Sequence, residues 1–149
     1  APTDSTRFKL VVFMAPKCPI CQDYTAILNQ LNHTFGEDVD FLAYFPNRHT
    51  SPEDVESFSK KYGLTFNAEA GGLDLAEELG ATVTPEVFLL NTTGQVVYSG
   101  RIDNRFFALG KRRSKVTHHD LRNALEQATD GQLPDPAITQ AIGCIIEFD

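Results

Sequence analysis

The sequence predicts an α/β fold in which a central mixed sheet is flanked by helices on both faces. The expected elements run strand, helix, strand, helix, short helix, hairpin and helix. A helix separates the first two strands, so these strands should be parallel, whereas the two strands of the hairpin must be antiparallel. The chain has 149 residues, a length typical of one domain, and we expect residues 1–149 to form a single domain.

The first half of the chain alternates strand and helix. Residues 8–14 are rich in Val and Phe and indicate a buried strand, and "VDFLAYF" at 39–45 indicates a second one. Between them, apolar residues at helical spacing predict an amphipathic helix that ends near Gly36. The stretch "SPED" then marks a helix start, because Ser51 can cap the helix and Pro52 suits its first position.

The second half is expected to contain a short helix, a hairpin and a final helix. The short helix covers residues 73–79, and "EVFLLNTTGQVVYSG" at 86–100 predicts two strands joined by a tight Asn/Gly turn. Few signals for secondary structure occur in residues 101–116. Thr117 and Asp120 then resemble a capping box that opens the last helix.

Composition and charge exclude several functions. The net charge is −7, which argues against nucleic-acid binding because that requires a basic surface. No apolar stretch approaches the roughly 20 residues of a membrane span. Three cysteines are too few for a disulfide scaffold, and the histidines lack the spacing of a structural zinc site. We therefore expect no nucleic-acid partner, no membrane span in this chain, no metal and no cofactor.

A cysteine pair lies in "APKCPICQDY", between the first strand and the first helix. Pro19 fits the first helical turn, so the helix should begin at Cys18. Free backbone N–H groups and the helix dipole then stabilise the Cys18 thiolate, and Lys17 adds a positive charge nearby. Cys21 lies one turn further on and can attack a mixed disulfide formed at Cys18.

Other roles for the cysteines remain open at this point. A Cys18–Cys21 disulfide could be structural, but it closes so short a loop that it would add little stability. A metal site is the other alternative, and the strand–cysteine pair–helix context favours redox chemistry over both. The third cysteine, Cys144, is flanked by apolar residues and is interpreted as a buried, inert thiol. Alternatively it lies near Cys18 and forms an alternative disulfide or a mixed one.

Two segments together, "VVFMAPKCPIC" and "TVTPEVFLLNTTGQVVYSGRID", resemble the thioredoxin-like superfamily. The similarity is strongest to the TlpA/ResA-type thiol-disulfide oxidoreductases and to the related redoxin (AhpC/TSA-like) domains. It covers about residues 8–128, which leaves residues 129–149 as a C-terminal extension. The resemblance implies a thioredoxin fold and residence outside the cytoplasm, in the periplasm or tethered to a membrane.

The resemblance also implies roles for residues near the cysteine pair. Pro85 is expected to be a cis proline beside the two thiols, with the Thr84 backbone free to pair with an extended substrate. Glu86 matches an acidic residue of the cytochrome-maturation members, where it could influence proton transfer; a solvated strand-end charge is the alternative. Pro16 and Lys17 replace the usual aromatic residue before the first cysteine, and we count them among the substrate-binding residues.

These observations predict a dithiol–disulfide oxidoreductase with Cys18, Cys21, Pro85 and Glu86 in its catalytic site. Its partners would be protein thiols or disulfides and an upstream redox protein. The alternative is a thioredoxin-fold copper chaperone or a redox-sensing binding module. Copper delivery would need a distal histidine, for which His49, His118 and His119 are candidates.

A basic cluster lies between the hairpin and the last helix. Residues 101–115 carry six of the thirteen Lys and Arg residues: Arg101, Arg105, Lys111, Arg112, Arg113 and Lys115. On an acidic protein such a cluster could dock an acidic partner. A solvated loop is the more common explanation.

Overall fold

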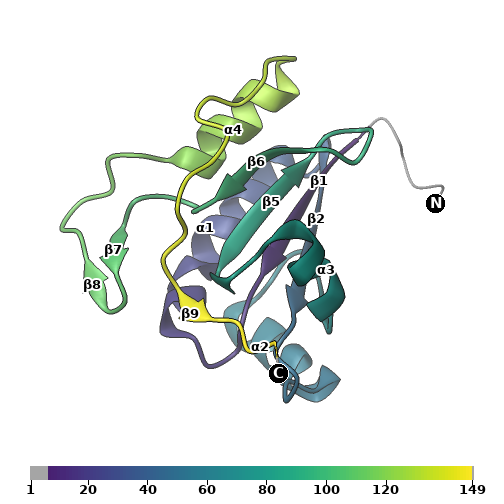
Figure 1. The fold of residues 1–149 in the computed structure, drawn as a ribbon, viewed down its shortest axis with the longest axis vertical. Coiled ribbons are helices and arrows are strands. Elements are labelled where there is room, and N and C mark those ends of the chain that lie inside the picture. The colour runs from purple at the N-terminus through teal and green to yellow at the C-terminus, as the bar shows by residue number, and fades with distance from the viewer. Residues whose placement is uncertain (1–6, 149) are drawn as a thin grey trace.

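The computed structural model describes residues 7–148 and shows the α/β architecture of Figure 1. Four helices are present in this range: α1 (Pro19–Phe35), α2 (Pro52–Tyr62), α3 (Leu73–Leu79) and α4 (Asp120–Thr129). The strands are β1 (Phe8–Phe13), β2 (Val39–Phe45), β3 (Asn67–Ala70), β4 (Val83–Thr84), β5 (Glu86–Leu90), β6 (Val96–Gly100), β7 (Phe106–Ala108), β8 (Lys111–Arg112) and β9 (Cys144–Ile145).

The central sheet has five strands in the order β3-β2-β1-β5-β6. Strands β1, β2 and β3 are parallel, whereas β5 runs antiparallel to both β1 and β6. The predicted mixed sheet and the β5–β6 hairpin are therefore confirmed. Strand β3 was not predicted, because "NAEA" carries no apolar run; its residues alternate between exposed and half-buried.

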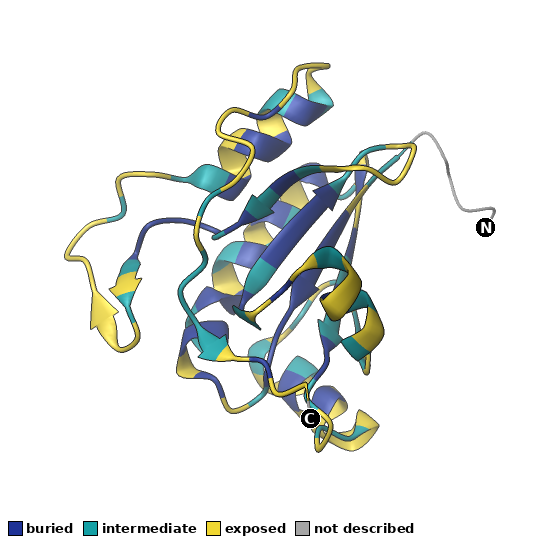
Figure 2. Cartoon of the chain, in the orientation of Figure 1, coloured by how far each residue is buried: buried dark blue, intermediate teal, exposed yellow. Residues whose placement is uncertain are grey.

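The central strand β1 buries side chains on both faces of the sheet. Leu10 and Val12 belong to a core cluster that includes buried residues of α1, α2 and α4. Val11 and Phe13 point the other way and pack in a second cluster with buried residues of α3 and the C-terminal segment. Figure 2 shows the result, a buried sheet with helices that expose only their outer sides. Each such buried aliphatic side chain stabilises the fold by about 1.5–3 kcal/mol.

The predicted N-terminal caps of α2 and α4 differ in outcome, because one capping side chain bonds within its own helix and the other bonds a distant residue. The predicted cap of α2 is confirmed: the Asp54 N–H donates to Ser51 Oγ over 3.1 Å, and the Ser51 N–H donates to the Asp54 carboxylate over 3.0 Å. The predicted cap of α4 is wrong, because His119 rather than Thr117 occupies the N-cap position. Thr117 Oγ1 instead accepts a hydrogen bond from the Asn104 side chain at 2.7 Å.

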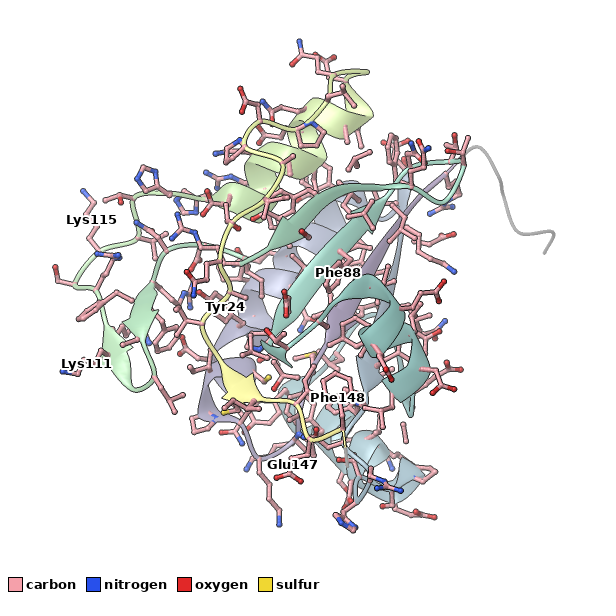
Figure 3. All side chains as sticks on the ribbon, viewed as in Figure 1. Tyr24, Phe88, Lys111, Lys115, Glu147 and Phe148 are labelled. Atoms are coloured by element: carbon pink, nitrogen blue, oxygen red, sulfur yellow. The ribbon has the colours of Figure 1, made fainter. Side chains whose placement is uncertain are left out.

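Part of the basic segment after β6 is paired with acidic residues within the molecule. Arg105 is buried and forms ion pairs with Asp103 at 3.1 Å and with Asp23 of α1 at 3.0 Å. Arg112 pairs with the same Asp23 at 3.0 Å. These contacts fix the β7–β8 hairpin to α1, so the basic cluster is not a free docking surface over its whole length. Figure 3 shows Lys111 and Lys115 at its outer side, pointing away from the sheet.

The C-terminal extension runs across the molecule from α4 to the far end of β9, as the yellow segment of Figure 1 shows. We call residues 137–147 the C-terminal strap. Near its start, the Ser99 N–H of β6 donates to Ala137 O, and the Thr139 N–H donates to Ser99 O, each at 2.9 Å. Within residues 7–148, no helix combines the length and hydrophobicity that crossing a membrane requires.

Candidate active site

The two paired cysteines lie where β1 leads into α1, as the sequence predicts. Cys18 is the N-cap residue of α1, with φ −79° and ψ 115°, and Pro19 occupies the first turn. Cys21 follows one turn later and is fully buried, whereas Cys18 is 3% exposed. Both thiols are free. The extended backbone at Cys18 places its side chain beside the unpaired N–H groups that begin the helix.

The surroundings of Cys18 favour its thiolate. Its pKa is lowered from 9.0 to about 5, chiefly because the Cys21 thiol donates a hydrogen bond to the Cys18 sulfur. A hydrogen bond from the Cys144 thiol lowers the pKa further, as do the backbone N–H groups of Cys21 and Ile20. Burial acts against these effects but does not cancel them. Cys18 is therefore largely ionised at neutral pH.

The surroundings of Cys21 have the opposite effect. Burial raises the pKa of Cys21 well above 9.0, and the neighbouring Cys18 raises it further. The Ala15 N–H donates to Cys21 Sγ over 3.4 Å, which only partly offsets the loss of water. The pair thus combines one ionised and one protonated thiol, the arrangement that attack followed by resolution requires.

Residues far along the chain complete the site. Cys18 Sγ lies 3.4 Å from the carbonyl oxygen of Thr84, to which the thiol donates when it is protonated, although 66 residues separate the two. Thr84 and Pro85 are buried, and the peptide bond between them is cis. The structure therefore brings together Cys18, Cys21, Thr84 and Pro85.

Glu86 has a local structural contact. Its carboxylate accepts hydrogen bonds from the backbone N–H groups of Thr82 at 2.9 Å and Val83 at 3.3 Å. These bonds hold the loop that carries β4 and so help to position Thr84. A part in proton transfer at the thiols stays a prediction.

Pro16 and Lys17 border a separate hollow beside the cysteine loop. A cavity of about 590 Å³ lies here, and His49, Asp54 and Glu147 are among its other lining residues. Lys17 is exposed, and the Pro16 carbonyl accepts a hydrogen bond from the Gln22 side chain at 2.9 Å. The cavity borders the loop that precedes Cys18, and its lining mixes polar and apolar side chains.

Cys144 is the site residue that sequence reasoning placed least well. It lies in β9, which pairs antiparallel with β4 so that Cys144 is opposite Thr84. Its side chain is half-buried and close enough to Cys18 to lower the pKa of that thiol, which fits the alternative position near Cys18 and not the interpretation as a buried, inert cysteine. The expectation that Thr84 offers a free backbone is also wrong, because β9 pairs with it. The glycine before Cys144 was the available signal for so close an approach.

A copper chaperone, the alternative function, would need several metal ligands close together, and the part of the chain that the structure describes contains no such cluster. No group of three or more His, Cys, Asp or Glu residues is arranged there to hold a metal ion. His49 lines the cavity beside Pro16 and Lys17, whereas the His118 carbonyl bonds the Asn104 backbone. The histidines are therefore not gathered with the thiols.

The sheet, the helix-capping cysteine and the Thr84–Pro85 segment define a protein of thioredoxin-like fold. Residues 4–106 match the family model of Redoxin, and the chain belongs to that family. No curated protein sequence gives a significant match.

Solved structures agree with this assignment. A hypothetical protein from Sinorhizobium meliloti is 26% identical, with a TM-score of 0.82 over 95% of this chain and 80% of that one. An uncharacterised protein from Geobacillus kaustophilus is 21% identical, with a TM-score of 0.81 over 97% and 78%. StoA from Bacillus subtilis shares the fold at 20% identity and a TM-score of 0.57, over 65% of this chain and 75% of its own.

Proposed function

We propose that this protein is a dithiol–disulfide oxidoreductase that exchanges electrons with protein thiols or disulfides through Cys18 and Cys21. The observation that carries the proposal is the placement of the two thiols: Cys18 is the N-cap residue of α1, and Cys21 is fully buried one turn later. In these positions the pKa of Cys18 is lowered to about 5, and that of Cys21 is raised. A structural disulfide would need no such difference. A low-pKa thiol at a helix N-terminus is typical of thiols that attack disulfides.

In the direction of substrate reduction, the Cys18 thiolate attacks one sulfur of the substrate disulfide. A Cys18–substrate bond forms, the substrate S–S bond breaks, and the other substrate sulfur leaves as a thiolate that takes up a proton. Cys21 then loses its proton and attacks Cys18, so that the second substrate sulfur leaves as a thiol. The dithiol has passed two electrons to the substrate, and the reverse sequence would oxidise a substrate dithiol.

The pKa of Cys21 falls at the moment when this thiol is needed. Part of the rise in its pKa comes from the neighbouring Cys18. Once Cys18 is bound to the substrate, its negative charge is gone and that part of the rise disappears. Resolution is therefore favoured after the mixed disulfide has formed, and not before.

The setting of the reaction is inferred from relatives. One solved structure of the same fold is described as a secreted disulfide oxidoreductase from Mycobacterium tuberculosis, at 20% identity and a TM-score of 0.53. Another is described as a thiol-disulfide oxidoreductase from Bacteroides fragilis, at 22% identity and a TM-score of 0.58. We extend this to an extracytoplasmic role here, with a redox protein upstream that restores the dithiol.

Turnover of insulin disulfides by the reduced protein tests the proposal. The wild type should reduce insulin repeatedly when a thiol reductant is supplied, and Cys18→Ser should abolish this activity. The matched control is His118→Ala, which removes another candidate copper ligand at an exposed position and should leave turnover unchanged. Turnover that survives in Cys18→Ser, or its absence in the wild type, would reject the proposal.

A further inference from the structure

The mechanism above leaves a third thiol unused beside the reacting pair. Thr84 connects the two places: its carbonyl oxygen lies 3.4 Å from Cys18 Sγ, and in the β4–β9 ladder it is opposite Cys144. The Thr84 hydroxyl also donates to the Cys144 carbonyl over 3.4 Å. Cys144 is thus held on β9, directly beside the strand whose Thr84 contacts Cys18.

The strap is anchored on both sides of Cys144. Upstream, the Thr139 hydroxyl bonds the Tyr98 hydroxyl at 2.7 Å and accepts from the Arg101 N–H at 3.0 Å. Downstream, Ile146 is 3% exposed, and its N–H donates to Thr82 O at 2.9 Å. The position of Cys144 is therefore fixed by contacts that do not involve its own side chain.

A glycine makes the close approach possible. A Cβ atom at Gly143 would overlap the carbonyl oxygen of Thr84, and the backbone nitrogen of Pro85 lies just beyond. Any larger residue at this position would push the strap away from β4 and carry Cys144 with it. Gly143 therefore allows the strap to pack closely against Thr84 and Pro85, which border Cys18.

The side chain of Cys144 is more exposed to solvent than that of Cys21. Cys21 is fully buried, whereas Cys144 is half-buried and lines a cavity of about 380 Å³ with Ile20, Phe106 and Leu109. Burial raises the pKa of Cys144 to about 12, and the neighbouring Cys18 adds to the rise. The contribution of Cys18 ends when Cys18 enters a mixed disulfide, so Cys144 becomes easier to ionise at that step.

We propose that Cys144 is a third catalytic thiol, which resolves the mixed disulfide on Cys18 and passes through a Cys18–Cys144 disulfide. This inference rests on the proposed function of the Cys18–Cys21 pair. The Cys144 thiolate attacks Cys18, the Cys144–Cys18 bond forms, and the bond from Cys18 to the substrate breaks. The substrate sulfur leaves and takes up the proton that Cys144 lost.

Cys21, the fully buried cysteine, carries out the last step of this reaction sequence. Cys21 attacks Cys18, which forms the Cys18–Cys21 disulfide and releases Cys144, and the proton from Cys21 ends on the Cys144 thiol. The same two electrons reach the substrate as in the two-thiol scheme, so no further oxidant or reductant is needed. In this scheme Cys144 links the fully buried Cys21, through Cys18, to a more exposed thiol.

The test removes Cys21 and asks whether Cys144 can resolve alone. Reduced Cys21→Ser and the matched Cys21→Ser/Cys144→Ser protein are each mixed with oxidised glutathione, quenched in acid and weighed intact by mass spectrometry. The double variant should keep one glutathione on Cys18. The single variant should lose it to an internal Cys18–Cys144 disulfide, because a neighbouring thiol acts at an effective concentration of about millimolar or more.

Peptide mapping and kinetics make the outcome decisive. The internal disulfide should join Cys18 to Cys144, and glutathione release should be first order and independent of protein concentration. Equal retention of glutathione by both variants would overturn the role of Cys144, as would release that accelerates with protein concentration.

The two proposals can fail separately. If the wild type reduces insulin while both variants retain glutathione equally, only the third-thiol step is rejected. If Cys18 forms no glutathione adduct in either variant and the wild type does not reduce insulin, the proposed function falls and this inference falls with it.

Discussion

Thr84 and Cys144 lie opposite each other in the antiparallel ladder of β4 and β9. The backbone edge that an extended substrate would use is therefore already paired with the chain's own C-terminal strap. A substrate that binds as an additional strand must displace β9, because one strand edge accepts one partner.

Gly143→Ala should loosen the strap. The new methyl group would overlap the Thr84 carbonyl, so we expect unfolding to become easier by about 1–3 kcal/mol, as for other overpacked sites. Cys18, which is 3% exposed, should also react faster with iodoacetamide at a fixed pH. Chemical denaturation and timed alkylation measure the two effects.

The control for this variant is Ile145→Ala. The Ile145 side chain is 78% exposed, so its removal should change stability by no more than about 0.5 kcal/mol. Unchanged stability and unchanged Cys18 alkylation in Gly143→Ala would contradict the close packing of the strap.

Asp103→Ala should destabilise the protein strongly. Asp103 is buried, pairs with Arg105 at 3.1 Å and accepts from the Tyr24 hydroxyl at 2.6 Å. Its loss leaves a buried guanidinium with Asp23 as its remaining ion-pair partner, and breaking such a pair costs about 3–5 kcal/mol. Lys115→Ala, on the exposed outer side of the same segment, should change stability by no more than about 0.5 kcal/mol. Equal effects of the two substitutions in urea denaturation would contradict this anchoring role.

The parts of the fold that sequence predicts well depend on local signals. The capping box at Ser51 and the hairpin turn after β5 are encoded within a few residues, and both are present. The strand–cysteine–helix junction is equally local. From such local signals the sequence predicts the central strands of the sheet and the position of the two cysteines at the start of α1.

The parts that sequence misses depend on distant partners. Thr117 looks like a helix cap, but Asn104 binds its hydroxyl from across the loop. Strand β9 has two residues and no periodicity, so only its pairing with β4 defines it. The position of Cys144 follows from that pairing, and no pattern within "AIGCIIEF" contains the identity of its partner.

Alkylation of Cys18 should follow a titration with a midpoint at about pH 5, because its pKa is lowered to that value. Iodoacetamide modification followed by peptide mass spectrometry should label Cys18 in mildly acid solution, with Cys21 unreactive because burial raises its pKa. Cys21→Ala removes the largest cause of the shift, so the midpoint should move up toward 9.0. A midpoint that stays at about 5 in this variant would contradict the assigned cause.

The same shift has a defined effect on stability. The folded-state pKa of Cys18 lies below its ordinary value of 9.0, so ionisation stabilises the reduced folded protein. That contribution is fully present above pH 9.0 and is lost as the pH falls through about 5. Denaturation of the reduced wild type and of Cys18→Ser should therefore show a stability difference that grows in favour of the wild type between these two pH values. A difference that shrinks as the pH rises would contradict the sign.

The reduction potential of the Cys18–Cys21 couple should lie between those of thioredoxin and DsbA, about −270 and −120 mV. A stabilised thiolate favours the reduced form and so makes the disulfide a stronger oxidant. The pKa of Cys18, about 5, falls between the values of about 7 for thioredoxin and about 3.5 for DsbA. Equilibration of the Cys144→Ala protein with glutathione buffers measures this couple without the third thiol. Because Cys144 contributes to the lowered pKa of Cys18, the variant's potential should lie closer to thioredoxin's than the wild-type value does. A potential at or below that of thioredoxin in the wild type would show that thiolate stabilisation does not set the redox direction here.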